Sequence, residues 1–252
     1  MKSMVSIYLE NEANKLREEI GARMEDPISI HQILKYKKVL GYFEPLDNGL
    51  SGMAIKIYDD GKDAKRFMLI NTDDPYCKQR FTAAHELYHL LVQNDFYYSY
   101  DEDVWGSADE EEKKANWFAT FLLLPEPGIK LLIPVDEQKK DRITISTLLK
   151  LEHNYRCSRQ SLLYRLKHLK LVSEEYVEAH RTKVKQTAIE YGYDISLYEP
   201  TRKTELVGDY NVLARRLYDS GKISQAKYYS YLRDMGINKV LEDNNAKENS
   251  IA

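Results

Sequence analysis

The stretch RFTAAHELYHLLV, residues 80–92, constrains the fold of this chain more than any other. An α-helix turns about 100° per residue, so His89 falls about 40° from His85, while alanines and leucines fill the opposite arc. A helix that is apolar over most of its circumference belongs inside a protein, where histidine and glutamate need polar partners. The stretch therefore predicts a buried helix whose polar groups gather on one side.

The spacing of His85, Glu86 and His89 gives these polar groups a chemical purpose. Imidazoles at positions i and i+4 can direct ring nitrogens at one ion, and the intervening glutamate can take a proton from metal-bound water. HExxH is for this reason the helix motif of zinc metalloproteases. The sequence predicts His85 and His89 as Zn²⁺ ligands and Glu86 as the catalytic base. The alternative is a pair of hydrogen-bonded core histidines without a metal.

A hydrolytic zinc site needs a third protein ligand and an open position for water. The acidic run 109–112 begins the next predicted helix, DEEEKKANWFATFLLLP. Asn116 and Ala119 share a helix face with Glu112, and their small side chains allow this face to approach the HExxH helix closely. Glu112 is therefore predicted as the third ligand, with Glu111 as the second choice. An acidic first turn that only suits the helix dipole is the other interpretation.

The pattern along the chain predicts an α+β fold. Helical spacing covers residues 4–24 and 28–40, SGMAIKIY and RFMLINT read as a β-hairpin, and KVLGYFE reads as a further strand. SYDEDVWGSA and SLYEPTRKTELVGD read as loops. We expect a mostly helical, zincin-like metalloprotease domain with a small antiparallel sheet over 1–137. A helix-turn-helix-like helical region over 138–180 and a C-terminal helical extension with a disordered tail over 181–252 follow it.

The segment ISTLLKLEHNYRCSRQSLLYRLKHL reads as two helices around a short break. One interpretation is DNA recognition, because basic residues lie near the second helix: Arg156, Arg159, Arg165 and Lys167. The favoured interpretation is a helical pair that packs on the metalloprotease domain or docks the substrate. The break carries no glycine, and the chain is slightly acidic overall, with a net charge of −3.

Cysteine content and hydropathy narrow the class of protein further. The only cysteines, Cys77 and Cys157, are far apart in the sequence, which argues against a disulfide framework and against a cysteine-based zinc site. The N-terminal residues lack the apolar run of a signal peptide, and no segment approaches the ~20 apolar residues of a membrane span. We expect a cytoplasmic protein without a membrane partner.

Taken together, RFTAAHELYH and the later ExxANxFAxxxLLP resemble the ImmA/IrrE family of metallopeptidases. In this sequence the second motif consists of Glu112, Ala115, Asn116, Phe118 and Ala119, and it ends at Pro125. The resemblance covers roughly residues 30–175, including the hairpin and SRQSLLYRLKHLKLV. Two linked motifs at suitable spacing are far more specific than HExxH alone.

The resemblance implies a gluzincin-like site with His85, His89 and Glu112 as zinc ligands and Glu86 as catalytic base. It further implies a cytoplasmic zinc endopeptidase that cleaves a partner helix-turn-helix repressor, often encoded beside it in a mobile element or stress-response locus, and so relieves repression. The competing function is a DNA- or partner-binding regulator whose zinc is structural or sensory and which does not cleave protein.

The sequence departs from the family pattern at two positions. Tyr88 stands where the family usually has glycine, and Gln93 stands where it often has another histidine. Neither change removes a predicted ligand, but Tyr88 lies on the metal side of the helix and could narrow the cleft. The group that stabilises the oxyanion is left open among several candidates: Tyr97, Tyr98, Tyr100, His153 and Arg165.

Overall fold

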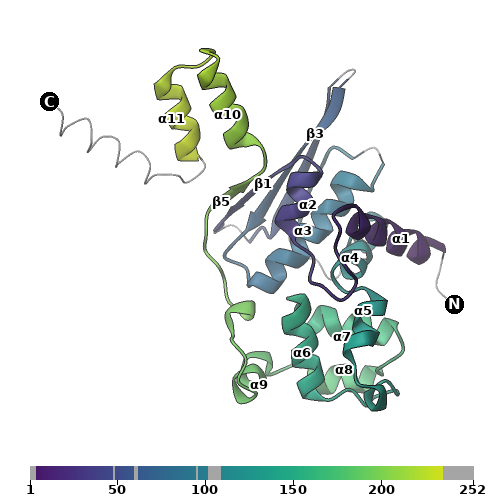
Figure 1. Cartoon of the computed structure of the whole chain (residues 1–252). Helices are drawn as coiled ribbons and strands as arrows, with labels where there is room; N and C mark the ends of the chain where they lie inside the picture. Colours follow the sequence, from purple (N-terminus) through teal and green to yellow (C-terminus); the bar gives the residue numbers. More distant parts are fainter. Residues whose placement is uncertain (1–3, 48, 60–61, 95, 102–108, 235–252) are drawn as a thin grey trace.

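The computed structural model describes residues 4–47, 49–59, 62–94, 96–101 and 109–234 (Figure 1). Its helices are α1 (Met4–Glu19), α2 (Ile30–Tyr36), α3 (Tyr76–Leu91), α4 (Glu110–Leu123), α5 (Glu126–Leu132), α6 (Ile145–Tyr155), α7 (Arg159–His168), α8 (Glu174–His180), α9 (Val184–Glu190), α10 (Tyr210–Asp219) and α11 (Gln225–Asp234). Its strands are β1 (Val39–Glu44), β2 (Gly52–Asp59), β3 (Lys62–Asn71), β4 (Tyr98–Asp101) and β5 (Glu205–Val207). The expected α+β, mostly helical fold class is confirmed. The predicted disordered tail lies outside the described residues.

The strands form one sheet in the order β4-β2-β3-β1-β5. β2 and β3 make the predicted antiparallel hairpin, with Ala54 opposite Met68. β1 pairs with β3 in parallel, Gly41 lying opposite Met68, so the prediction of a purely antiparallel sheet is wrong for this pair. Side-chain alternation along a strand shows which face is buried, but it carries no information on the direction of the partner strand.

The edge strand β5, and β4 except for Tyr98, lie in segments that the sequence pattern assigned to loops. β4 pairs with β2, and β5 pairs with β1, both antiparallel. Each is short and is bonded to a neighbouring strand on one side only. Strands this short offer too few residues for the hydrophobic alternation by which strands are recognised in a sequence. Residues 102–108 of the predicted loop are outside the described part.

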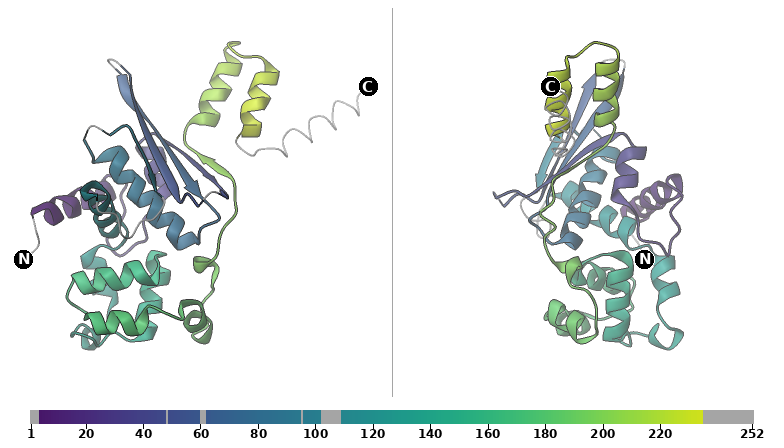
Figure 2. Two further views of the ribbon diagram at one scale, coloured as in Figure 1. Left: turned by 180° about the vertical axis from the view of Figure 1, so that it is seen from behind. Right: turned by 60° about the vertical axis from the view of Figure 1, so that its left-hand side comes forward.

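Helices pack beside the sheet and beneath it (Figures 1 and 2). α3 contacts β2 and β3, and α4 contacts both α3 and α1. A continuous apolar core extends from Leu16 in α1 through Phe118 in α4 to Leu148 and Val177 in the region α6–α8. The helix-turn-helix-like region therefore shares a core with the preceding helices. The division at 137/138 and 180/181 stays a prediction.

The turn between α6 and α7 explains how this helical pair forms without glycine. Arg156 ends α6 in the left-handed conformation, with φ of 52°, and Ser158 caps α7 by accepting a hydrogen bond from Ser161 N. Arg159 and Arg165 are buried, with exposed fractions of 2 % and 0 %, and pair with Glu152 and Glu10 respectively. Two of the four predicted basic residues therefore cannot reach a phosphate backbone in this conformation.

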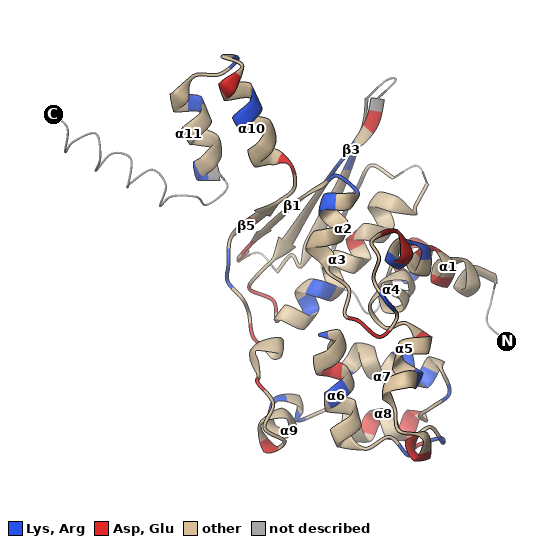
Figure 3. Cartoon of the chain, viewed as in Figure 1, with Lys and Arg blue, Asp and Glu red and all other residues tan. Residues whose placement is uncertain are grey.

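After α9 the chain returns along the body, adds β5 to the sheet and ends its described part in the hairpin α10–α11. This hairpin packs chiefly on itself and projects beyond the sheet (Figures 1 and 2). Basic and acidic residues are interspersed over the ribbon, in line with the small net charge (Figure 3). Within the described residues, no helix has both the length and the apolar character needed to cross a membrane.

Candidate metal centre

The HExxH part of α3 is buried, as its composition predicts. His85 and His89 are each 1 % exposed and Glu86 is 0 % exposed. α4 lies against α3, with Ala115 and Ala119 fully buried in its core-facing side. These small side chains let the two helices approach closely, which brings the first turn of α4 beside the histidines.

Glu112 is the acidic residue that this approach brings to the histidines. Its Oε2 lies 2.9 Å from His85 Nε2, and its Oε1 lies 3.4 Å from His89 Nε2. The two Nε2 atoms are 3.1 Å apart. One ligand atom from each of the three residues lies within 4.8 Å of the others, a spacing that suits ligands about 2 Å from a common ion.

Amide oxygens fix the tautomer of both imidazoles. His85 Nδ1 lies 2.9 Å from Asn116 Oδ1, and His89 Nδ1 lies 2.5 Å from Gln93 Oε1. An amide oxygen can only accept, so each Nδ1 carries the proton and donates it. Each Nε2 faces Glu112 and is the ring nitrogen available to a metal ion. Partners of this kind orient and polarise imidazoles in metal sites.

The electrostatics favour the same protonation state. Burial and the neighbouring His85 ring lower the pKa of His89, which keeps that imidazole neutral. The close contact with His85 lowers the pKa of Glu112, which keeps the carboxylate ionised. Two imidazole nitrogens and an ionised carboxylate thus converge, and neutral imidazole with ionised carboxylate is what a metal ion requires. The donor set fits a divalent cation.

Glu86 lies on the side of α3 that faces β2. A Cβ atom built on Gly52 would come within 3.4 Å of Glu86 Oε1 and within 2.4 Å of Thr82 Cγ2. The backbone of β2 therefore passes directly beside this carboxylate, and a side chain at position 52 has no room. The sequence analysis did not single out Gly52, because the close approach depends on how the strand crosses the helix.

Tyr88 and Glu111 interact with each other instead of with the histidines. The Tyr88 hydroxyl donates to Glu111 Oε2 at 2.7 Å, and Lys114 Nζ lies 2.6 Å from Glu111 Oε1. Burial raises the pKa of Tyr88, so its hydroxyl keeps its proton. Glu112, the first choice, is therefore in the cluster, while Glu111 is held on the neighbouring face.

The candidates for oxyanion stabilisation lie in different parts of the structure. His153 and Arg165 lie in the helical region, where His153 packs on Tyr193 and Tyr198 and Arg165 donates to Leu124 O and Glu10. Tyr97 is 62 % exposed and packs against Tyr58. Tyr98 and Tyr100 belong to β4, which is bonded to β2 beside the site. The choice among the tyrosines stays open.

Two polar residues of the site were not assigned a polar role from the sequence. Asn116 entered as a small side chain beside Glu112 and as a member of the second family motif, and Gln93 entered as a departure from the family pattern. Each lies four positions after a proposed ligand, Glu112 and His89 respectively; Asn116 is on the same face of α4 as Glu112, and Gln93 directly follows the end of α3. This spacing is the signal that could have identified them as partners of the imidazoles.

Comparison with known families adds an independent observation. A family model of a peptidase, described as the IrrE N-terminal-like domain, matches residues 42–167, half of the 252-residue chain. The matched range contains the HExxH segment of α3, all of α4 and α6, and α7 except its last residue. A search of curated proteins found no match.

Proposed function

Because the chain belongs to the IrrE N-terminal-like family of metallopeptidases, we propose that it is a zinc-dependent endopeptidase acting on a partner transcriptional repressor. The observation that carries the proposal is the convergence of His85, His89 and Glu112 around one point, with Glu86 on the same helix. Two imidazoles and one carboxylate are a donor set typical of catalytic zinc, because they leave a further position for water.

Each residue has a distinct role in the proposed reaction. His85, His89 and Glu112 hold the ion, which when bound supplies Lewis acidity to the scissile carbonyl and to water. Glu86 accepts the proton of the attacking water and delivers it to the leaving amine. Asn116 and Gln93 keep the imidazoles in the ligating tautomer through the bonds to Nδ1.

The proposed substrate is a helix-turn-helix repressor in a mobile-element or stress-response circuit. The resemblance of the paired motifs to the ImmA/IrrE family supports this substrate, and the family match agrees with a protein substrate in general. Cleavage would separate parts of the repressor and so relieve repression. The protein is proposed to act in the cytoplasm, where such a repressor is found.

The competing function is a DNA- or partner-binding regulator with a structural or sensory zinc ion. DNA binding through α7 has less support, because the guanidinium groups of Arg159 and Arg165 are buried and paired. The proposed enzyme needs a base at position 86 to cleave its substrate. A regulator that only binds its partner does not need this base.

The decisive experiment compares Glu86→Gln with wild type, using a repressor encoded beside this chain as substrate. Glu86→Gln should retain one equivalent of zinc per chain and lose cleavage by about 10²- to 10⁴-fold, because only the proton carrier is removed. Mass spectrometry of the products measures cleavage, and elemental analysis measures zinc. Glu110→Gln, which changes an exposed carboxylate of α4, is the matched control and should cleave normally. Undiminished cleavage by metal-loaded Glu86→Gln would refute this role for Glu86.

A further inference from the structure

A cavity of about 370 Å³ lies against the other side of α3 from the metal centre. α3 contributes Tyr76, Arg80 and Ala83 to its lining, and Arg80 lies about 140° around the helix from His85. The cavity therefore does not belong to the metal cluster, although one helix borders both. Its volume falls within the range of about 300–1,000 Å³ that is typical of small-molecule sites.

The C-terminal segment forms another wall of this cavity. Tyr76 N donates to Glu199 O at 2.9 Å, Arg202 N donates to Thr72 O at 2.9 Å, and Gln79 Nε2 donates to Thr201 Oγ1 at 3.0 Å. This segment runs beside the start of α3 on its way to β5 (Figure 1). It lies beyond residue 167, where the family match ends, so the family domain alone does not build the cavity.

Arg80 places a buried positive charge at the cavity. The residue is 6 % exposed, and its guanidinium donates to the carbonyl oxygens of Arg156, at 3.2 Å, and Ile28, at 2.8 Å. Burial lowers the pKa of Arg80, but an arginine in a protein keeps its charge. No carboxylate pairs with it anywhere in the described part of the chain. A buried charge without a counter-charge is unfavourable, and an anion in the cavity would offset this cost.

The remaining charges at the cavity leave the positive excess in place. Lys203 also lines it, and basic residues colour both the first turns of α3 and the segment entering β5 (Figure 3). The carboxylate of Glu205 lies at the same lining but faces His31, with Oε2 2.9 Å from His31 Nε2. It is therefore directed to another partner than Arg80.

Thr72 adds an unused hydrogen-bonding group. It lines the cavity and is 2 % exposed, and its Oγ1 makes no hydrogen bond within the described residues. A buried hydroxyl of this kind can donate to an acceptor oxygen of a ligand. Ile30, Phe43 and Ala83 supply apolar surface to the same space, which suits the body of a small organic molecule.

We propose that this cavity binds a small organic anion, with its carboxylate or phosphate at Arg80 and Thr72 and a planar apolar body against Phe43. Arginine recognises carboxylate and phosphate alike, because its planar fork matches both. The proposal goes beyond the peptidase function and does not depend on it. The ligand would contact both α3 and the C-terminal segment 196–205. Its binding would therefore stabilise the packing of this segment on the helix that carries HExxH.

The test measures binding to the full, metal-loaded chain without any measurement of cleavage. The probes are benzoate, phenyl phosphate and the neutral benzamide, titrated by calorimetry and by amide chemical shifts. We expect at least one anion to bind with a Kd of about 1 mM or tighter, and benzamide to bind about tenfold more weakly or worse. Comparison of the two anions decides between carboxylate and phosphate. The shifts should centre on Thr72, Gln79 and Thr201.

Three variants test the assignment to this cavity. Arg80→Gln should abolish the preference for the anion, and Lys203→Gln should weaken binding about threefold or more. Thr72→Val, which keeps the side-chain volume and removes an unbonded hydroxyl, should fold at least as stably as wild type and bind the anion more weakly. Lys222→Gln, far along the chain in the α10–α11 turn, is the control and should bind as wild type does.

Any of three results would overturn the proposal. The first is the absence of binding of both anions to wild type. The second is equally strong binding of benzamide and the anions, and the third is anion binding that is unchanged in both Lys203→Gln and Thr72→Val. Lys203→Gln and Thr72→Val keep the test valid if Arg80→Gln fails to fold.

Discussion

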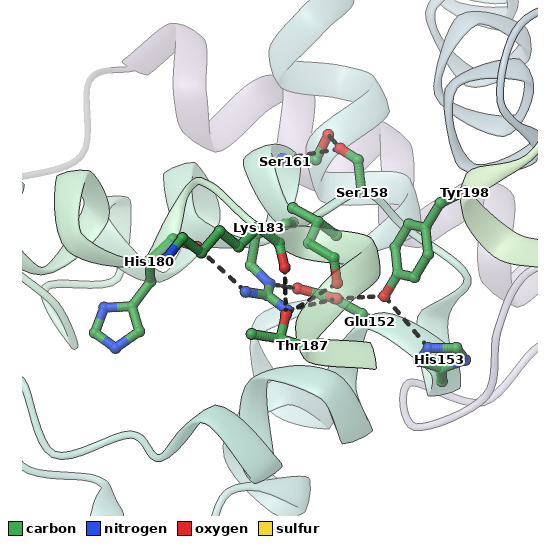
Figure 4. A network of polar contacts seen from close by, with 10 residues as sticks. Glu152, His153, Ser158, Ser161, His180, Lys183, Thr187 and Tyr198 are labelled. Carbon is green, nitrogen blue, oxygen red and sulfur yellow. Dashed lines mark hydrogen bonds and ion pairs between the residues drawn. The ribbon is translucent and has the colours of Figure 1, made fainter. Parts of the chain in front are cut away.

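Two buried polar clusters of this molecule differ in how their hydrogen-bond donors and acceptors are matched. In the helical region, the guanidinium of Arg159 pairs with Glu152, whose Oε2 also accepts a hydrogen bond of 2.6 Å from the Tyr198 hydroxyl (Figure 4). At the metal centre, His85, His89 and Glu112 bring three acceptor atoms together. The first cluster contains its own cation, whereas the second has no positive group among its converging atoms.

The difference separates a structural cluster from a functional one. In the Arg159 cluster the donors and acceptors match, and the guanidinium also donates to His180 O at 3.2 Å and lies 3.5 Å from Thr187 Oγ1 (Figure 4). Such a network rigidifies the core. The acceptors of the metal centre match only when a cation joins them. Burial alone would not distinguish the two clusters, but the direction of their hydrogen bonds does.

The largest expected effect is on cleavage when the cation is removed. Chelation, or His85→Ala, should lower cleavage on the order of a thousandfold or more, because the ion supplies several kcal/mol of stabilisation to the transition state. Product formation over time, followed by mass spectrometry, measures this. Restored zinc should rescue the chelated protein but not His85→Ala. Cleavage that persists in thoroughly demetallated protein would remove the distinction drawn between the clusters.

The next effect concerns the Arg159 cluster and leaves the metal untouched. Arg159→Met should lower the free energy of unfolding by about 3–5 kcal/mol, because it leaves the Glu152 carboxylate buried without its partner. Urea denaturation measures this loss, and zinc content should be unchanged. The double variant Arg159→Met/Glu152→Leu should recover much of it.

An exposed ion pair supplies the control for this prediction. Lys130 pairs with Glu126 across one helical turn at 2.6 Å, and Lys130→Met should cost at most about 0.5 kcal/mol. If Arg159→Met were equally mild, the buried network would not be a stabilising element of the helical region.

A smaller effect is expected at the amide partners of the imidazoles. Asn116→Leu and Gln93→Leu should each weaken zinc affinity by about 10- to 100-fold, because Nδ1 loses the acceptor that fixes its tautomer. Competition with a chromogenic chelator measures the affinity. Thr120→Val removes the hydroxyl that donates to Asn116 O and should leave zinc affinity near that of wild type. Equal affinity in all three variants would show that the amides are not needed for the metal.

The smallest effect is expected at Tyr88. Tyr88→Phe removes the hydrogen bond to Glu111 and should lower the free energy of unfolding by about 1 kcal/mol. Zinc content should stay at one equivalent, because Glu111 is held away from the histidines. A loss of zinc in this variant would indicate that Glu111 takes part in metal binding and would contradict its separation from the metal cluster.

The chain's local spacing already determined much of the metal centre. His85, Glu86 and His89 lie on one buried helix face because the turn of an α-helix fixes their relative directions. Glu112 followed from the small residues on its face of α4, which predict close helix packing. The hairpin β2–β3 and the helical pair α6–α7 also followed from local patterns, because their partners are neighbours in the sequence.

Tertiary structure alone decided which distant segments meet. The parallel pairing of β1 with β3, the edge strands β4 and β5, and the contact of Gly52 with Glu86 all depend on the path of the chain. The cavity at Arg80 depends on it too, because residues 196–205 close a space that begins at α3. Periodicity reports the environment of a side chain, buried or exposed, and that environment is the same whichever distant segment provides it.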